Sequence, residues 1–368
     1  MEKKSTSYIE KFVIITLVLI ICIGSLEIGL RLIGRQPTNT TMGISEQWGS
    51  CFRIKKNIEK RINSPAFNFT VFTNEFGFRD KKIGKRNIGK KPYYVFLGAS
   101  EVFANGVNYE DSFVGIFADF ASKKKIDVLN LAVGGHRFPD QDSLFKEFLS
   151  IAPQKPTICF NCVNDLHIPK FDKKQEDLIV KNGHVFEKNS WKSAYVRRLL
   201  GDYSAAYVFF RNNIRKLQEQ YLNFKPSGDM PEFFQIYSKK NRMHNSKNIK
   251  KFENYLLGFE KYCYDNDITP IFVYLPITDS YDLNDLLKEH NENPEDYDSS
   301  YYSSLMENYC KRHNSKLINL RPVLEKYHND GKELRFKLDP HFNLFANRII
   351  GEYLIRTIFP METYSSAN

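Results

Sequence analysis

Five short apolar segments alternate with amphipathic stretches, and this alternation restricts the fold more than any other feature of the sequence. The apolar segments lie at Tyr93–Leu97, Val128–Val133, Thr157–Val163, Pro270–Leu275 and Lys316–Leu320. Each has the length and composition of a strand that is buried on both faces. Helical spacing occurs at Ser112–Phe120, Tyr255–Cys263, Tyr301–His313 and Asn343–Ile358. This order predicts an α/β fold, in which helices cover both faces of a parallel sheet.

A second feature is the apolar segment near the N-terminus. No charged residue occurs from Phe12 to Leu26, and the apolar character resumes from Ile28 to Ile33. A helix over residues 12–33 would be roughly 33 Å long at about 1.5 Å per residue, which matches the hydrocarbon core of a bilayer. We therefore expect residues 1–35 to form a cytoplasmic tip and one membrane-spanning anchor.

The charges around this segment predict its orientation. Lys3, Lys4 and Lys11 precede it, so the positive-inside rule places the N-terminus in the cytoplasm and the rest of this single-pass protein outside it. A cleaved signal peptide is the alternative, but no small-x-small cleavage site follows the apolar core. Cys22 follows an isoleucine where a lipoprotein site requires a small residue, so lipidation is disfavoured as well.

Composition limits the classes of partner. The formal charge is +10, which would suit an anionic partner. However, the lysines of Lys81–Lys91 are mixed with glycine and asparagine, as in solvated loops, so we do not expect nucleic acid binding. The six cysteines show no disulfide framework. Cys159 and Cys162 form a CxxC inside a predicted strand, where they point to opposite faces, which favours two buried thiols over a redox pair.

The same patterns divide the chain. Residues 36–68 are polar and rich in turn residues and are expected to form a linker with little regular structure. Residues 69–360 form the α/β domain, and residues 361–368 form a tail. An insertion at about 169–249 interrupts the domain, with a hairpin around Lys181–Gly183, a helix near Ala205–Tyr221 and a polar loop to about Asn248. Insertions at strand ends often determine substrate specificity.

Four short blocks carry reactive or polar groups, and three of them follow predicted strands, where open α/β sheets bind ligands. They are Gly98-Ala99-Ser100, Gly134-Gly135, Asn164-Asp165 and Asp339-Pro340-His341. Taken singly, each block has an ordinary structural explanation as a helix cap or a turn. Together they supply a hydroxyl nucleophile, backbone and amide donors for an oxyanion, and a histidine with a nearby carboxylate.

In this order along the chain, the four blocks resemble those of the SGNH (GDSL-type) hydrolase family. Residues 73–80, Thr-Asn-Glu-Phe-Gly-Phe-Arg-Asp, are similar to a stretch that precedes the nucleophile in membrane-anchored bacterial members. The His341-Phe-Asn343 start of the last helix and the Leu26-Glu27 to Leu30-Arg31 end of the anchor are also similar. The likeness covers the anchor, residues 69–168 and residues 253–357.

The resemblance implies a three-layer, flavodoxin-like domain that hydrolyses esters through an acyl-serine intermediate. It implies Ser100 as the nucleophile, His341 as the base and Asp339 as the acid that orients the base. It further implies an oxyanion hole formed by the N–H groups of Ser100 and Gly135 and the side chain of Asn164. No metal or organic cofactor is expected. The exported location suggests an acyl or acetyl ester of a cell-envelope glycan or lipid as the substrate.

Three positions depart from the family pattern. Ala99 replaces the aspartate of the GDS signature, Cys162 replaces a common glycine, and Asp339 precedes His341 by two residues instead of three. Two other functions therefore stay open. The same residues could transfer the acyl group to a sugar hydroxyl of a surface polysaccharide, or the domain could bind a glycan without catalysis.

Overall fold

The computed structural model describes residues 8–34, 37, 43–49, 51–64, 66–85, 88–169, 178–221, 234–277, 280–337 and 339–360. The tail predicted at 361–368 lies outside these residues. An eight-stranded sheet forms the centre, in the order β12-β11-β8-β6-β7-β5-β4-β3. Five strands are parallel: β6 (Tyr93–Leu97), β7 (Asp127–Asn130), β8 (Ile158–Asn164), β11 (Thr269–Leu275) and β12 (Leu317–Asn319). Three antiparallel strands extend one edge: β3 (Glu59–Asn63), β4 (Asn68–Thr73) and β5 (Arg79–Asp80).

The order of the parallel strands places the site. Numbered along the chain, the five strands lie in the order 2-1-3-4-5, which is the flavodoxin-like order of a doubly wound sheet. The winding reverses at β6, between its neighbours β7 and β8. Ligands of such sheets bind outside the carboxyl ends of the strands at this switch point. Ser100, Gly134 and Asn164 all lie at or just past these strand ends.

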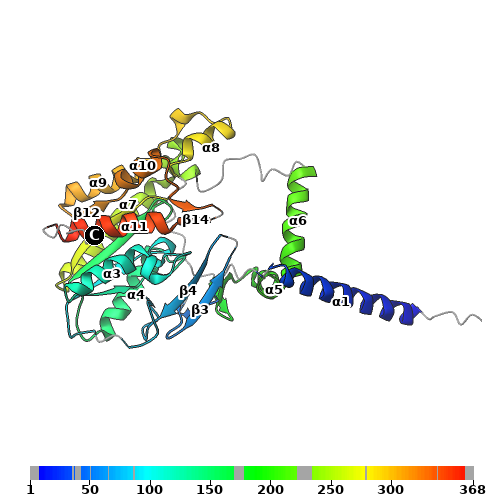
Figure 1. The fold of residues 1–368 in the computed structure, drawn as a ribbon. Coiled ribbons are helices and arrows are strands. Elements are labelled where there is room, and N and C mark those ends of the chain that lie inside the picture. Colours follow the sequence, from blue (N-terminus) through cyan, green and yellow to red (C-terminus); the bar gives the residue numbers. More distant parts are fainter. Residues whose placement is uncertain are drawn as a thin grey trace, which may run out of the picture.

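Helices cover both faces of the sheet (Figure 1) because successive strand residues point to opposite sides. On β6, Phe96 packs on Phe117 of α3 (Phe113–Lys123), whereas Tyr93 packs on Phe148 of α4 (Phe138–Ile151). Helix α11 (Leu344–Ile358) contacts α3 on the first face. On the second face, α7 (Lys239–Tyr264) packs beside α4, and both α7 and α9 (Tyr301–His313) pack on Phe272 of β11.

Several shorter elements complete the domain. They are α2 (Ser100–Phe103), α8 (Leu283–Glu289), α10 (Arg321–Asn329), β13 (Arg335–Phe336), β14 (Asp339–Phe342) and the 3-10 turns η1 (Tyr109–Asp111), η2 (Gln235–Tyr237) and η4 (Pro294–Asp296). β13 and β14 form a separate two-stranded antiparallel sheet.

Three expectations need correction. The central sheet is mixed and not wholly parallel. The segment expected to be a linker at 36–68 contains β1 (Ser45–Trp48), β2 (Cys51–Ile54) and β3. The apolar pattern of the sequence does not indicate these strands because they are short. In β3, only Ile62 is buried, and it follows three exposed charged residues. The polar loop expected to reach Asn248 ends earlier, because α7 begins at Lys239, and its first ten residues contain only one apolar side chain, Met243.

The insertion forms a compact group of elements. The predicted hairpin is confirmed as β9 (Leu178–Lys181) and β10 (His184–Glu187), and the predicted helix as α6 (Ala205–Tyr221). Between them lies α5 (Trp191–Tyr203), which contacts both β10 and α6. The insertion therefore connects the sheet domain with the N-terminal helix, because α6 also contacts α1.

The N-terminal helix α1 (Tyr8–Leu32) projects away from the sheet domain (Figure 1). Its mean hydropathy reaches 2.6 over an 18-residue window, and it is long and apolar enough to cross a membrane. Most of its apolar side chains are exposed, and Leu30 is buried near its C-terminal end.

Candidate active site

The turn that carries Ser100 depends on a glycine. A Cβ atom at Gly98 would lie 2.2 Å from Cγ2 of Val102 and 3.4 Å from Cβ of Cys162, so no larger residue fits there. Ala99 caps α2 without a side-chain hydrogen bond, as expected when alanine replaces an aspartate. Ser100 begins α2 and is half-buried, and its hydroxyl donates to Oε2 of Glu101 at 3.3 Å.

The predicted base and acid form a pair. Nδ1 of His341 lies 2.6 Å from Oδ1 of Asp339, and the backbone N–H of His341 donates to the same oxygen at 2.9 Å. Burial alone would raise the pKa of Asp339, but these hydrogen bonds outweigh it and the pKa is lowered. A two-residue spacing thus brings the carboxylate to the ring. With the Nδ1 proton donated to Asp339, Nε2 carries the lone pair that a general base needs.

Nε2 of His341 has a neighbour that the sequence did not indicate. It lies 3.3 Å from Nδ2 of Asn105, which can donate to it. Asn105 follows α2 directly, in an Asn-Gly turn that sequence patterns describe only as a turn. The base is therefore held by an amide in the state that the structure shows.

Ser100 and His341 lie on two elements that contact each other. Helix α2 contacts β14. A Cβ atom at Gly134 would lie 3.8 Å from Cβ of Ser100 and 4.0 Å from Nδ2 of Asn105. Ser100 and Asn105 therefore both lie beside this glycine. The hydroxyl of Ser100 bonds to Glu101 and not to His341. The structure thus places Ser100 and Asn105, the hydrogen-bond neighbour of His341, beside the same glycine, without a hydrogen bond between Ser100 and His341.

The predicted oxyanion donors lie around Ser100. Oδ1 of Asn164 accepts from the N–H groups of Leu166 and His167 at 3.1 and 3.2 Å, which forms an Asx turn. Its Nδ2 donates to Oε2 of Glu101 at 3.2 Å. The turn and the donor role are therefore compatible, since they use different atoms of one side chain. Gly135 has φ of +86°, a conformation that favours glycine.

Glu101 is the unexpected member of the site. One carboxylate oxygen, Oε2, accepts from both the Ser100 hydroxyl and the Asn164 amide. The Ser100 hydroxyl is the predicted nucleophile, and the Asn164 amide is a predicted donor to the oxyanion of the substrate. The Glu101 carboxylate therefore occupies both groups in the structure.

A buried arginine supports the loop after α2. Arg79 donates to the carbonyl of Ala104 at 2.6 Å and also to those of Phe103 and Val107. Its guanidinium lies over the ring of Phe103, 4.9 Å from the centroid. Burial lowers the pKa of Arg79 to about 9, so the side chain stays charged at neutral pH.

Arg79 belongs to residues 73–80, the segment that resembles a stretch of membrane-anchored SGNH hydrolases and that had no predicted role. Asn74 accepts from the N–H groups of Phe76 and Phe78, and Gly77 between them has φ of +83°. A Cβ atom at Gly77 would lie 2.5 Å from the carbonyl oxygen of Ile54. This tight turn delivers Arg79 to the loop that carries Asn105.

The neighbouring polar residues have structural roles. Asp165 is fully buried and accepts from the hydroxyls of Tyr237 and Tyr274, and burial raises its pKa. Nε2 of His136 lies 2.6 Å from the carbonyl oxygen of Phe52, and burial lowers the pKa of this histidine. These residues fasten β8 and α4 to adjacent segments.

Cys159 and Cys162 are buried and free, as predicted, and burial raises the pKa of both thiols. Within the described ranges, no group of three or more His, Cys, Asp or Glu side chains is arranged to hold a metal ion.

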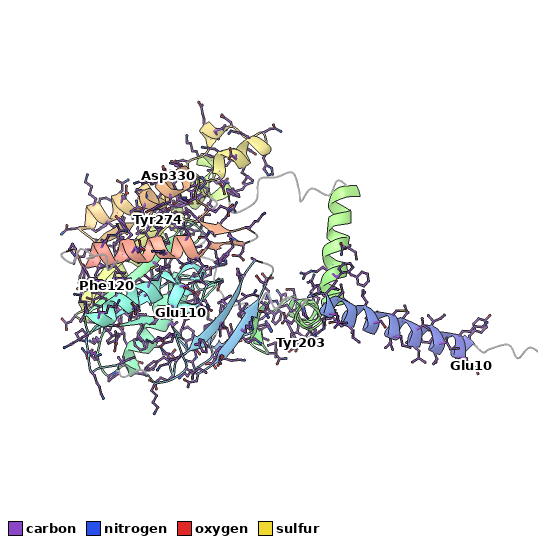
Figure 2. All side chains as sticks on the ribbon, viewed as in Figure 1. Glu10, Glu110, Phe120, Tyr203, Tyr274 and Asp330 are labelled. Carbon is purple, nitrogen blue, oxygen red and sulfur yellow. The ribbon has the colours of Figure 1, made fainter. Side chains whose placement is uncertain are left out.

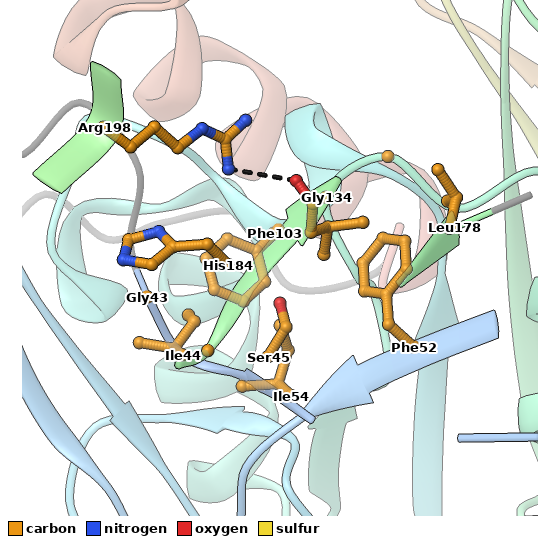
Figure 3. Close-up of a pocket in the computed structure, with 13 residues that line it drawn as sticks. Gly43, Ile44, Ser45, Phe52, Ile54, Phe103, Gly134, Leu178, His184 and Arg198 are labelled. Atoms are coloured by element: carbon orange, nitrogen blue, oxygen red, sulfur yellow. Dashed lines mark hydrogen bonds between the residues drawn. The ribbon is translucent and has the colours of Figure 1, made fainter. Parts of the chain in front are cut away.

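A pocket of about 340 Å³ opens beside the glycine pair (Figure 3). Its lining includes Gly134 and Gly135, so it begins next to Ser100. The walls are mostly apolar and come from β1, β2, α2 and the hairpin of the insertion, with Arg198 of α5 at the rim. The apolar lining includes Ile44, Phe52, Ile54, Phe103, Leu178 and Val185.

No protein-family model matches the sequence, and no curated protein matches it. Solved structures do show similarity. The chain is similar to a lipolytic protein of the G-D-S-L family from Veillonella parvula, with 13% identity and a TM-score of 0.40, over 73% of this chain and 99% of that one. It is also similar to the acetyl xylan esterase AlAXEase, with 13% identity and a TM-score of 0.38, over 73% of this chain and all of that one.

A third similar structure is an acetyl xylan esterase from Geobacillus stearothermophilus, with 12% identity and a TM-score of 0.39, over 76% of this chain and 100% of that one. The first of these structures carries the name of the family that the four sequence blocks resemble. The function of this chain is inferred from the residues of its own site.

Proposed function

We propose that this chain is a membrane-anchored serine hydrolase of ester bonds, with Ser100 as nucleophile, His341 as base and Asp339 as the acid that orients the base. The observation that carries the proposal is the Asp339–His341 pair. The ring of His341 presents Nε2 as an acceptor, and Asn105, which contacts Nε2, lies beside Gly134 as Ser100 does. An imidazole in this state can take a hydroxyl proton near neutral pH.

Two hydrogen bonds change before the reaction. The Ser100 hydroxyl leaves Glu101 and donates to Nε2 of His341, which releases Asn105. The Ser100 oxygen then attacks the ester carbonyl carbon while Nε2 takes the proton. The bond between the carbonyl carbon and the alkoxy oxygen breaks, and the alcohol leaves with the proton from His341. Water then attacks the acyl carbon while Nε2 takes its proton. The bond between the acyl carbon and the Ser100 oxygen breaks, that oxygen takes the proton from His341, and the acid leaves.

The oxyanion forms between these steps. We assign its stabilisation to the Asn164 side chain and to the N–H groups of Ser100 and Gly135. Because the Asn164 amide donates to Glu101 in the resting state, the Glu101 carboxylate moves away when the substrate carbonyl enters. Loss of one such donor costs about 10²–10³ in kcat, so Asn164→Ala is expected to retain weak activity.

The size and apolar lining of the pocket favour the acyl group as the part of the substrate that binds there. Its volume of about 340 Å³ falls in the range of small-molecule sites, and its walls are mostly apolar. We propose an acyl ester of a cell-envelope glycan or lipid as the substrate, with the acyl chain in this pocket. Val185→Trp should reduce kcat/KM for a 4-nitrophenyl octanoate ester and leave the acetate ester nearly unchanged. An equal loss for both esters would place the acyl chain elsewhere.

The decisive experiment is active-site labelling of the full chain in detergent. A fluorophosphonate probe should label the wild type, and Ser100→Ala should abolish both labelling and ester hydrolysis. Ser122→Ala is the matched control, because Ser122 is an exposed serine at the end of α3. Labelling that survives in Ser100→Ala would exclude Ser100 as the nucleophile. Absence of labelling in the wild type would favour glycan binding without catalysis.

Acyl transfer uses the same residues and is separated by product analysis. With a sugar alcohol present as acceptor, a hydrolase should form free acid faster than new ester. The reverse ratio would identify an O-acyltransferase. Neither outcome changes the assignment of Ser100.

The proposed location follows from α1 and the lysines before it. We propose that α1 spans the membrane with the N-terminus in the cytoplasm and the sheet domain outside it. Protease added to intact cells with a permeabilised outer layer should then digest the sheet domain and leave a tag at the N-terminus protected. A protected sheet domain would contradict this orientation.

A further inference from the structure

Helix α5 exposes an apolar face. Val196, Leu199, Leu200 and Tyr203 are 55%, 37%, 43% and 71% exposed. Their spacing of three, four and seven residues puts them on one stripe of the helix. A helix on the surface of a soluble domain would turn such a stripe inward, so this face is made for an apolar environment.

The opposite face of α5 carries the polar contacts. Arg198 donates to the carbonyl of Val185 at 3.0 Å, and Asp202 lies 3.5 Å from Nε2 of His184. Both contacts are to β10, and the ring of Tyr195 packs on Phe186 of the same strand. The polar side of α5 therefore rests on the hairpin beside the pocket, and its apolar side points away from the protein.

Helix α6 continues this surface. Phe209, Phe210 and Ile214 are 39%, 49% and 52% exposed. In Figure 1, α6 runs across the C-terminal end of α1 instead of continuing along it. A helix transverse to one that spans a membrane lies along the membrane surface.

The C-terminal end of α1 binds the junction at which α5 ends and α6 begins. The carboxylate of Glu27 accepts from the N–H groups of Ala205 and Ala206 at 3.0 and 2.9 Å and from the hydroxyl of Ser204. It thereby satisfies the free amides at the start of α6 and complements the helix dipole. Leu30 of α1 is buried against the two alanines.

Arg31 completes the junction. It pairs with Glu27 at 2.7 Å and donates to the carbonyl of Tyr203 at 2.8 Å, so both α5 and α6 are fixed where α1 ends (Figure 2). The exposed apolar stripe of α5 is thus placed at the level where an apolar anchor leaves a bilayer.

We infer that α5 and the first turns of α6 form an interfacial element that inserts its apolar face into the boundary between the headgroups and acyl chains of the membrane. The inference rests on the proposed membrane anchor. Its exposed cations, Lys192, Arg197 and Arg211, suit the anionic headgroups at that level. The element also holds the pocket, whose rim includes Arg198, close to the lipid surface.

The test uses nitroxide spin labels on the full chain in vesicles of phosphatidylcholine and phosphatidylglycerol. Collision with oxygen reports a lipid environment, and collision with a water-soluble nickel complex reports an aqueous one. Cys22 is exposed on α1, whereas the other five cysteines are buried, so a label on the wild type reports the anchor. Leu200→Cys in a Cys22→Ala chain reports α5. Ile151→Cys in the same chain is the control, because Ile151 is an exposed apolar residue of the sheet domain.

The interfacial element predicts an oxygen-to-nickel ratio at Leu200 that is several-fold above that at Ile151 and below that at Cys22. Equal ratios at Leu200 and Ile151, with a lipid signal at Cys22, would overturn the inference and leave the anchor intact. An aqueous signal at Cys22 would overturn the anchor and the inference together. Dipolar broadening between Leu200 labels, with no lipid signal, would show that a second copy of the chain covers this face and would also overturn it.

Discussion

The sheet domain buries its apolar residues in its interior. The anchor-proximal region, which consists of α1, α5 and α6, exposes many of its apolar residues on its surface. In the sheet, Phe96 and Phe160 stack at 4.3 Å and are fully buried. In the anchor-proximal region, Leu200 and Phe210 point outward, and the carboxylate of Glu27 binds the corner of α5 and α6. The two regions show that burial follows the surrounding solvent, which is water for one region and, in our proposal, lipid for the other.

The two regions also use a charge in the same way. Arg79 donates to backbone carbonyls at the C-terminal end of α2, and Glu27 accepts from backbone amides at the N-terminal end of α6. Each charge has the sign that complements its helix end. A single charged side chain therefore binds a helix terminus in both regions, one at the loop of Asn105 and one at the C-terminal end of α1.

The largest expected difference comes from one substitution made in both regions. Phe160→Ala removes a fully buried ring and should lower the free energy of unfolding by about 3–5 kcal/mol. Phe210→Ala removes a half-exposed ring and should change it by roughly 0.5 kcal/mol or less in detergent. Urea unfolding of the two variants in the same detergent measures both values. Equal losses would contradict the contrast between the regions.

Arg79→Met should have the next largest effect. It leaves three backbone carbonyls without their donor in a buried site, which should cost about 2–4 kcal/mol. Because these carbonyls belong to the loop of Asn105, kcat for ester hydrolysis should fall more than KM changes. Arg79→Lys is the control, since it keeps the charge but loses the fork of donors. Full recovery by lysine would show that charge alone holds the loop.

Glu27→Ala should have a smaller and local effect. Loss of a carboxylate cap costs about 1 kcal/mol, and only the start of α6 depends on it. Hydrogen exchange at the amides of Ala205 and Ala206 should become faster in the variant. Exchange at β6 and β8 should stay unchanged, and faster exchange there would mean that the two regions unfold together.

The smallest effect concerns pH and the sheet domain alone. The pKa of Asp339 is lowered in the folded state from its ordinary value of 3.8. Its carboxylate therefore stabilises the fold above that value, and this contribution is lost as the pH falls through the folded pKa. The difference in unfolding free energy between the wild type and Asp339→Asn should shrink on acidification from pH 5, as measured by urea unfolding. A constant difference would exclude this linkage.

The sequence predicted those elements that have a strong period. The helices at Tyr301–His313 and Ala205–Tyr221 and the strand at Tyr93–Leu97 agree with the structure at both ends. Strand β3 was missed because it lies near the edge of the sheet with mainly charged residues. An apolar pattern cannot detect a strand that buries so little.

The candidate site was predicted at the level of strand ends but not of hydrogen bonds. The switch point brings Ser100, Asn164 and the loop of Gly134 together, because parallel strands end at one edge. Asn105 and Glu101 escaped notice, since a turn asparagine and a helical glutamate follow no pattern that signals chemistry. Partners of the Ser100 hydroxyl and the His341 ring depend on side-chain rotamers, which spacing along the chain does not determine.

The hydrogen bonds of Glu27 and Arg31 to the junction of α5 and α6 affect which substrates Ser100 can reach. A catalytic domain joined to its anchor by a long flexible linker would reach substrates over a wide range of distances from the membrane. Contacts fasten the insertion to the C-terminal end of α1, so in our proposal Ser100 is held at a nearly constant height above the bilayer. The proposal therefore expects Ser100 to act on esters at that height and not on the same chemical group farther from the bilayer.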